Sequence, residues 1–284
     1  MIDGTSLALI RLALREDLGG FGDVTSEWTV PHGTMSRGRV AAREELVVSG
    51  LPLAAAVLQE VDPAARFQAL MEEGALVEAG AVLADVSGQA RSLLAAERTM
   101  LNLLTHLCGV ATQARRFAFA VEGTRVDVLD TRKTTPGLRY WEKRAVRHGG
   151  CANHRFGLFD MVLIKDNHLA AAGGVKAAVT RAKALTPMSM KVEVEVTDEA
   201  GLRAALAAGA DVVMLDNQSL EELRRLTAIA RAIRPQAIIE ASGTVRLDTV
   251  RAVAETGVDC VSTSALTQGA PPVDLGLDFE EEEA

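Results

Sequence analysis

Five cationic residues stand at or just after short apolar segments in the second half of the chain, and their types suit an anionic substrate. They are Arg132, Lys133, His154, Arg155 and Lys165. A guanidinium group presents a fork of N–H donors that matches a planar carboxylate, so paired arginines indicate a substrate that carries carboxylates. Lysine and histidine add charge that can hold a further anionic group at the same place.

Oxygen donors and small residues occupy the equivalent positions in the later segments. Glu195 and Asp216 each follow an apolar run, and such carboxylates can hold a hydrated Mg²⁺ or the hydroxyls of a sugar. The stretches ASGT, with Ser242 and Gly243, and STSAL, with Ser264, are small and precede expected helix starts, where backbone N–H groups bind phosphate. A substrate with several carboxylates, a metal and a terminal phosphate together indicate transfer of a phosphoribosyl group to an acidic acceptor.

These residues require a scaffold that brings several segment ends together. Six apolar, β-branched runs are each followed by sequence rich in Ala, Leu and Arg: residues 126–133, 160–168, 191–196, 211–218, 237–244 and 259–264. Strand-then-helix units of this kind predict a parallel sheet with right-handed crossovers. The sheet could stay open and doubly wound, or close into an incomplete α/β barrel of the TIM type. Lys191, Glu193 and Glu195 alternate with valines, and charges on one strand face favour the barrel, whose chemistry lies at the carboxyl ends of the strands.

The first half of the chain has a different pattern. Residues 37–88 predict an antiparallel sheet, and the N-terminal stretch of residues 1–20 predicts an amphipathic helix with Leu7, Ile10, Leu12 and Leu14 inward. Residues 90–120 predict one long helix with a polar stripe at helical spacing, formed by Arg98, Asn102, His106, Gly109 and Thr112. We therefore expect an N-terminal α/β domain of antiparallel sheet and helices over residues 1–110, with the C-terminal tail 269–284 packed on it, and a barrel domain with the active site over residues 111–268.

Composition limits the classes of function. The 284 residues carry 30 Lys and Arg against 38 Asp and Glu, and this acidic balance argues against general nucleic-acid binding. No apolar run reaches the length of about 18 residues that a membrane helix needs, so no membrane association is expected. Three widely spaced cysteines argue against a disulfide framework or a zinc site and fit a reducing, cytoplasmic location.

One stretch is basic despite the acidic total. Residues 125–155 contain eight cations against three acids. The ends of this stretch belong to the site described above. Its middle part, with Arg139, Lys143, Arg144 and Arg147, fits one face of a solvated helix, or a subunit surface to which Arg139 and Arg144 contribute.

Several motifs closely resemble the quinolinate phosphoribosyltransferase family, in the order in which that family has them. They are ERTMLNLLTHLCGVAT, DTRKTTPGLRYWEKRAVRHGG, NHRFGLFDMVLIKDNH, VEVEV, AGADVVMLDN and EASG, and the resemblance covers nearly the whole chain. It implies transfer of phosphoribosyl from phosphoribosyl pyrophosphate to quinolinate, with Mg²⁺ and loss of CO₂, in the biosynthesis of NAD. It also implies a homodimer, or a higher homo-oligomer, in which Arg98 reaches the neighbouring subunit's active site.

The resemblance also implies a role for each site residue. Thr131 stands with Arg132, His154 and Arg155 on the side of the quinolinate carboxylates. Lys133 and Lys165 lie between the acceptor and the phosphates and act electrostatically. Glu195 and Asp216 lie by the ribose and Mg²⁺, and Ser242, Gly243 and Ser264 lie by the 5′-phosphate. Two departures fall in that phosphate pocket: Thr244 replaces a second glycine, and Ser264 and Gln268 replace Gly and His in the last loop.

Three other functions remain open from the residues alone. Lys165 ends a barrel strand, as the lysine of a Schiff-base aldolase does. The basic stretch could instead bind RNA or a partner in a salt-sensitive manner. A related phosphoribosyltransferase with another acceptor, such as nicotinate, also fits the altered phosphate loops.

Overall fold

A computed structural model describes residues 2–280, and within it the chain forms two compact units. The first comprises the described residues up to Arg115, Thr135–Gly150, and the described residues from Ala270 onward. The second comprises Arg116–Thr134 and Cys151–Gly269. The segment Thr135–Gly150, placed with the barrel in the sequence-based division at residue 110, thus groups with the first unit.

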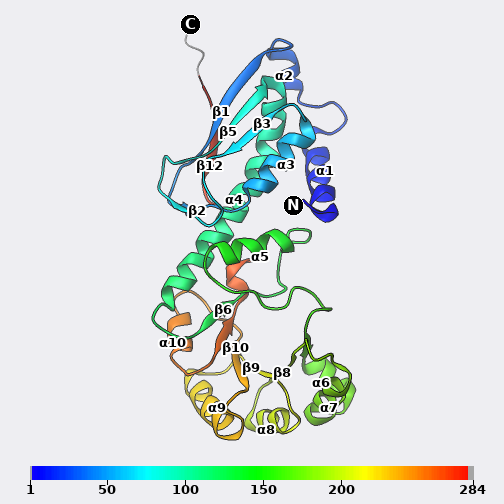
Figure 1. The fold of residues 1–284 in the computed structure, drawn as a ribbon, viewed down its shortest axis with the longest axis vertical. Coiled ribbons are helices and arrows are strands. Elements are labelled where there is room, and N and C mark those ends of the chain that lie inside the picture. The colour runs from blue at the N-terminus through cyan, green and yellow to red at the C-terminus, as the bar shows by residue number, and fades with distance from the viewer. Residues whose placement is uncertain (1, 281–284) are drawn as a thin grey trace. The chain divides into compact units, whose positions relative to one another are not determined.

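The first unit is built on a four-stranded antiparallel sheet with the order β12-β1-β5-β3 (Figure 1). Its strands are β1 (Met35–Ala42), β3 (Arg66–Ala69), β5 (Val82–Gln89) and β12 (Leu275–Phe279), and a small ladder joins β2 (Leu46–Val47) to β4 (Leu76–Val77). Its helices are α1 (Gly4–Leu18), α2 (Val24–Thr29), α3 (Leu51–Val61) and α5 (Arg139–His148), with most of α4 (Ala90–Ala120). The last part of the described chain therefore returns to the N-terminal sheet as an edge strand.

Helix α1 begins where its sequence provides a cap, since the Asp3 carboxylate accepts from the Ser6 N–H at 2.7 Å. Ile10 and Leu14 are buried, as expected. Leu12 was also predicted to face inward, but this prediction is wrong, because Leu12 is 59% exposed. Leu12 lies two residues from each of them, which on a helix places it on the opposite face.

Helix α4 spans residues 90–120, as predicted, but its polar stripe has two different parts. Arg98 and Asn102 are exposed, whereas Gly109 and Thr112 are buried. The Thr112 hydroxyl accepts from the Val47 N–H at 2.9 Å, so the later part of the stripe serves packing within the chain.

The second unit is a six-stranded parallel sheet with the order β6-β11-β10-β9-β8-β7 (Figure 1). The strands are β6 (Asp127–Leu129), β7 (Val162–Ile164), β8 (Val192–Val196), β9 (Val212–Asp216), β10 (Ile238–Ser242) and β11 (Cys260–Ser262). From β7 to β11, each strand pairs with the next strand in the chain. The last strand, β11, pairs with the first strand, β6, and β6 and β7 form the two edges of the sheet. This is the order of a barrel that is open between its first two strands, which confirms the predicted incomplete α/β barrel.

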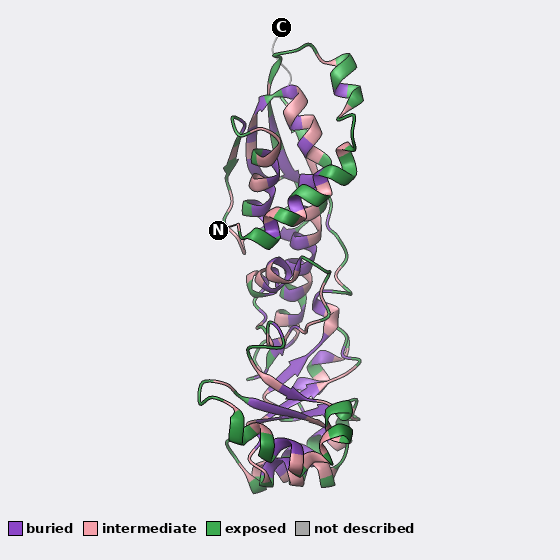
Figure 2. Ribbon diagram, turned by 90° about the vertical axis from the view of Figure 1, so that its right-hand side faces the viewer, coloured by how far each residue is buried: buried purple, intermediate pink, exposed green. Residues whose placement is uncertain are grey.

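Helices connect these strands and surround the sheet. They are α6 (Asp166–Ala172), α7 (Val175–Leu185), α8 (Glu199–Ala207), α9 (Leu220–Ile233) and α10 (Val250–Ala254), followed by a short 3₁₀ helix, η1 (Ser264–Leu266). The strands are largely buried and the outer faces of the helices exposed (Figure 2). No helix in residues 2–280 combines the length and apolarity required to span a membrane.

Candidate active site

One cavity of about 930 Å³ lies at the carboxyl ends of the barrel strands. Neighbouring strands end at the same level, because Ser242 is in register with Asp216 on one side and with Ser262 on the other. Eleven of the twelve predicted site residues line this cavity: Thr131, Arg132, Lys133, His154, Arg155, Lys165, Glu195, Asp216, Ser242, Gly243 and Ser264. The twelfth, Arg98, is exposed on α4 in the first unit and is not part of the cavity wall.

A buried carboxylate positions the cationic wall of the cavity. Asp130 is 0% exposed, and it accepts from the Asn153 side chain at 2.6 Å and from the His154 N–H at 2.9 Å. These bonds hold the segment with His154 and Arg155 beside the end of β6. The sequence analysis did not assign a role to Asp130, although an acid directly before Thr131 and Arg132 was a signal for one.

The two arginines of this wall lie close enough to affect each other. Burial lowers the pKa of Arg155, and the charge of Arg132 lowers it further. Like charges held together in a cavity favour the binding of an anion, and two guanidinium forks suit a dicarboxylate.

Oxygen ligands line the same cavity near the ends of β8 and β9. Lys165 Nζ pairs with Glu195 Oε2, and Asp216 accepts from the Asn217 side chain at 2.7 Å. Glu195 and Asp216 therefore offer the hard oxygen ligands that fit Mg²⁺, which is commonly held by one or two carboxylates together with substrate phosphates. The ion pair with Glu195 positions the Lys165 side chain at the end of β7.

The loop after β10 forms one end of the cavity and requires a glycine. Gly243 has φ of 129°, and a Cβ atom there would lie 2.3 Å from Asn217 Oδ1. Asn217 is the one described residue other than glycine with a positive φ. The backbone of Thr244 therefore has a conformation that a residue with a Cβ atom can adopt. Thr244 also lines the cavity.

The last loop is connected to the cationic wall. Thr263 Oγ1 accepts from the Ala265 N–H at 3.1 Å and caps η1, which Ser264 begins. The Thr267 hydroxyl donates to the Lys133 carbonyl at 2.8 Å. Ser264 and Gln268, which stand where the resemblance implies Gly and His, thus lie in an ordered loop that lines the cavity.

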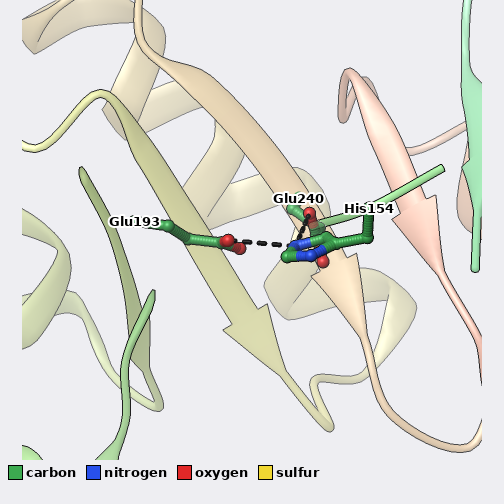
Figure 3. A group of neighbouring side chains, drawn as sticks. All are labelled: His154, Glu193 and Glu240. Atoms are coloured by element: carbon green, nitrogen blue, oxygen red, sulfur yellow. Dashed lines mark ion pairs between the residues drawn. The ribbon is translucent and has the colours of Figure 1, made fainter. Parts of the chain in front are cut away.

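His154, which lines the cavity, forms a cluster with the buried side chains of Glu193 and Glu240 (Figure 3). His154 Nε2 lies 3.0 Å from Glu193 Oε2 and 3.5 Å from Glu240 Oε2. Burial disfavours a charged His154 ring, whereas the two carboxylates favour a proton on the Nε2 atom that faces them. Burial also raises the pKa of Glu193. The sequence pattern did not indicate a role for Glu240, because this residue lies inside an apolar strand, two residues before Ser242.

The middle of the basic stretch differs from the sequence-based interpretation of a solvated helix face. Lys143 on α5 is 4% exposed, Arg139 and Arg144 are half-buried, and Arg147 alone of the four is exposed. Arg144 lies over the rings of Tyr140 and Trp141, at 5.8 and 5.6 Å from their centroids. The helix is thus a packed element, and its charges are not a general polyanion-binding surface.

Both units match domains of one known family. Residues 23–108 match the domain described as "Quinolinate phosphoribosyl transferase, N-terminal domain", and residues 110–278 match the corresponding C-terminal domain. The chain is 43% identical over 273 residues to the nicotinate-nucleotide pyrophosphorylase [carboxylating] of Mycobacterium leprae, and the match covers 95% of each chain.

Solved structures agree with these relationships. The nicotinate-nucleotide pyrophosphorylase from Francisella tularensis superimposes with a TM-score of 0.91 at 38% identity, covering 97% of this chain and 96% of that one. The enzyme family therefore follows from the sequence match, and the common fold from the superposition. The chain belongs to the quinolinate phosphoribosyltransferase family.

Proposed function

We propose that the cavity binds quinolinate and phosphoribosyl pyrophosphate and joins them, with Mg²⁺, to give nicotinate mononucleotide, pyrophosphate and CO₂. The observation that carries this proposal is the distribution of charge in one cavity. Arg132, Lys133 and Arg155 line it together with the carboxylates of Glu195 and Asp216, and the loop with its obligatory glycine, Gly243, belongs to the same lining. The membership in the family supports the same reaction.

Quinolinate carries two carboxylates, and Arg132 and Arg155 offer two guanidinium forks for them. The mutual repulsion of these arginines is relieved when a dianion lies between them. His154 belongs to the same wall and is held from behind by Glu193 and Glu240. An acceptor with one carboxylate, such as nicotinate, would leave part of this charge unmatched, so we favour quinolinate.

Phosphoribosyl pyrophosphate would lie toward the other wall. Its 5′-phosphate would be bound by Ser242, Gly243 and Ser264, where small residues let backbone N–H groups approach. Glu195 and Asp216 would hold the ribose hydroxyls and Mg²⁺, which when bound supplies positive charge for the pyrophosphate group. Lys133 and Lys165 would lie between acceptor and phosphates and stabilise the charges there.

The chemistry depends on position and electrostatics more than on a protein nucleophile. Departure of pyrophosphate leaves a ribosyl centre with oxocarbenium character, which the pyridine nitrogen attacks. Carboxylates at Glu195 and Asp216 favour the positive charge that develops at this centre. Once the ring nitrogen is alkylated, the C–C bond to the adjacent carboxylate breaks and CO₂ leaves. The electron pair of that bond remains on the ring carbon, where the neighbouring positive nitrogen stabilises it, and the carbon then takes a proton from water, so no dedicated protein base is required.

The direct test is an assay with quinolinate, phosphoribosyl pyrophosphate and Mg²⁺ that follows both CO₂ and nicotinate mononucleotide. We expect both products in equal amounts, and much lower turnover when nicotinate replaces quinolinate. A protein that forms neither product from quinolinate, or that prefers nicotinate, contradicts the proposal.

A further inference from the structure

A line of polar side chains inside the barrel connects the two ends of the cavity. The Ser262 hydroxyl donates to Glu240 Oε1 and lies 3.0 Å from the Ser242 hydroxyl, while Glu240 Oε2 lies 3.5 Å from His154 Nε2. Glu240 is 1% exposed and Ser262 is 2% exposed. Water therefore does not compete for these contacts, and each bond is stronger than its equivalent at the surface.

The donor and the acceptor of each hydrogen bond in this line follow from the number of protons that are available. A hydroxyl has one proton, and the Glu240 carboxylate is a stronger acceptor than a second hydroxyl. Ser262 therefore donates to Glu240, and the Ser242 hydroxyl donates to Ser262 Oγ. A phosphate at Ser242 would draw this proton toward itself and leave Ser262 without its donor.

We propose that Glu240 and Ser262 are positioning residues that couple occupation of the phosphate end of the cavity to the hold on His154 at the acceptor end. This inference rests on the proposed function for the identity of the two ends. When Ser262 loses the bond from Ser242, its own hydroxyl becomes a weaker donor to Glu240, because hydrogen bonds in a chain strengthen one another. Glu240 then attracts the Nε2 proton of His154 more strongly, and the ring that faces the acceptor carboxylates is held more firmly.

The same three residues, His154, Glu193 and Glu240, have ligand atoms that all lie within 4.8 Å of one another, as a metal site would. The other side of the ring argues against a metal. The Arg155 N–H donates to His154 Nδ1 at 2.8 Å, so Nδ1 is an acceptor and the proton belongs on Nε2, toward the carboxylates. A metal at Nε2 would displace that proton to Nδ1, where it would oppose the Arg155 amide.

The coupling can be observed by NMR of protein labelled with ¹⁵N-histidine, using inorganic phosphate as the probe. The chain has five histidines, and a His154→Gln variant assigns the signal. We expect phosphate to move the Nε2 proton of His154 downfield in the wild type and to leave it unmoved in Ser262→Ala. The matched control Ser189→Ala, an exposed serine outside the cavity, should respond as the wild type does.

Several results would overturn the coupling: an unmoved His154 signal in the wild type, an equal movement in Ser262→Ala, or one bound metal ion per chain with no proton on Nε2. Kinetics supply a second readout, because in the wild type the apparent KM for quinolinate should fall about two- to tenfold as phosphoribosyl pyrophosphate goes from low to saturating concentration. In Ser262→Ala this KM should stay the same at every concentration of phosphoribosyl pyrophosphate, and a variant with the wild-type dependence contradicts the coupling. The NMR result needs no turnover, so loss of the coupling and failure of the proposed reaction can be told apart.

Discussion

At the scale of single residues, Arg132 is the clearest test of the acceptor site. It lines the cavity next to Arg155, on the wall proposed to bind the quinolinate carboxylates. A charge-assisted hydrogen bond contributes about 1.5–3 kcal/mol, so Arg132→Ala should lower kcat/KM for quinolinate by about one to two orders of magnitude or more. Steady-state kinetics at saturating phosphoribosyl pyrophosphate measure this effect.

Arg147 provides the matched control, because it belongs to the same basic stretch but is exposed on α5 and absent from the cavity wall. Arg147→Ala should keep the kcat/KM of the wild type. Equal kcat/KM for Arg132→Ala and wild type would remove Arg132 from the acceptor site.

Residue types after strand ends were sufficient to predict most of the cavity wall, because parallel strands must bring those positions together. Residues inside the strands were not predictable in the same way. In the sequence, Glu240 is a single acid within an apolar strand. In the fold, its Oε2 atom lies 3.5 Å from His154 Nε2. Asp130 follows β6 and stands beside Thr131 in the sequence, but its partners Asn153 and His154 come from a segment more than 20 residues later, so only the fold brings them together.

At the scale of elements, Glu142 joins α5 to α4 and to the loop that follows Lys133. It is 0% exposed, lies 2.8 Å from His106 Nε2, and accepts from the Thr135 N–H at 3.1 Å. Burial alone would raise the pKa of Glu142, but His106 and Thr135 outweigh burial and lower it below its ordinary value of 4.5.

A carboxylate whose pKa is lowered by folding stabilises the folded state above its unfolded pKa and loses that effect as the pH falls through the folded value. Wild type should therefore exceed Glu142→Gln in unfolding free energy by about 1.5–3 kcal/mol at pH 6–7. The difference should shrink below about pH 4.5, as urea denaturation at several pH values can measure. A difference that stays constant down to pH 3 would show that the charge of Glu142 is not what stabilises these elements.

Helix α4 contains a second test, at the glycine of its polar stripe. Gly-to-Ala in a helix ordinarily adds up to about 1 kcal/mol of stability. A Cβ on Gly109, however, would lie 2.2 Å from the Pro271 carbonyl oxygen, so the C-terminal segment would have to move. We expect Gly109→Ala to lower the unfolding free energy by about 1–3 kcal/mol.

The control for this change is Gly20→Ala, since Gly20 is exposed and no atom lies within 4 Å of its Cβ position. Its urea midpoint should stay near that of the wild type. A Gly109→Ala protein as stable as the wild type would show that the segment around Pro271 does not need close contact with α4.

Local sequence patterns predicted a helix or strand well where its own residues determine where it begins and ends. The span of α4 is an example. The burial of Lys143 on α5 was not predictable, because four cations at helical spacing look solvated when the surroundings are unknown. The position of β12 beside β1 also depends on a pairing between chain ends more than 200 residues apart.

At the scale of the whole molecule, the open question is how Arg98 serves the reaction. It is exposed on α4, in the first unit, and does not line the cavity of the second. The resemblance to the family motifs implies that Arg98 enters the site of a neighbouring subunit, and we propose a homodimer on that basis. In such a dimer each active site needs Arg98 from one chain and Arg132 from the other.

This arrangement predicts complementation between two inactive variants. Arg98→Ala and Arg132→Ala should each lose most of their activity, but subunits exchanged at equal amounts should recover about a quarter of the wild-type activity. The reason is that half of the dimers are mixed, and each mixed dimer has one site with both arginines intact. A mixture of Arg132→Ala with Lys165→Ala should recover nothing, because both changes lie in the cavity of a single chain and every site then carries one of them. Failure of the first mixture to recover, with exchange verified by native mass spectrometry, would show that Arg98 does not complete the neighbouring site.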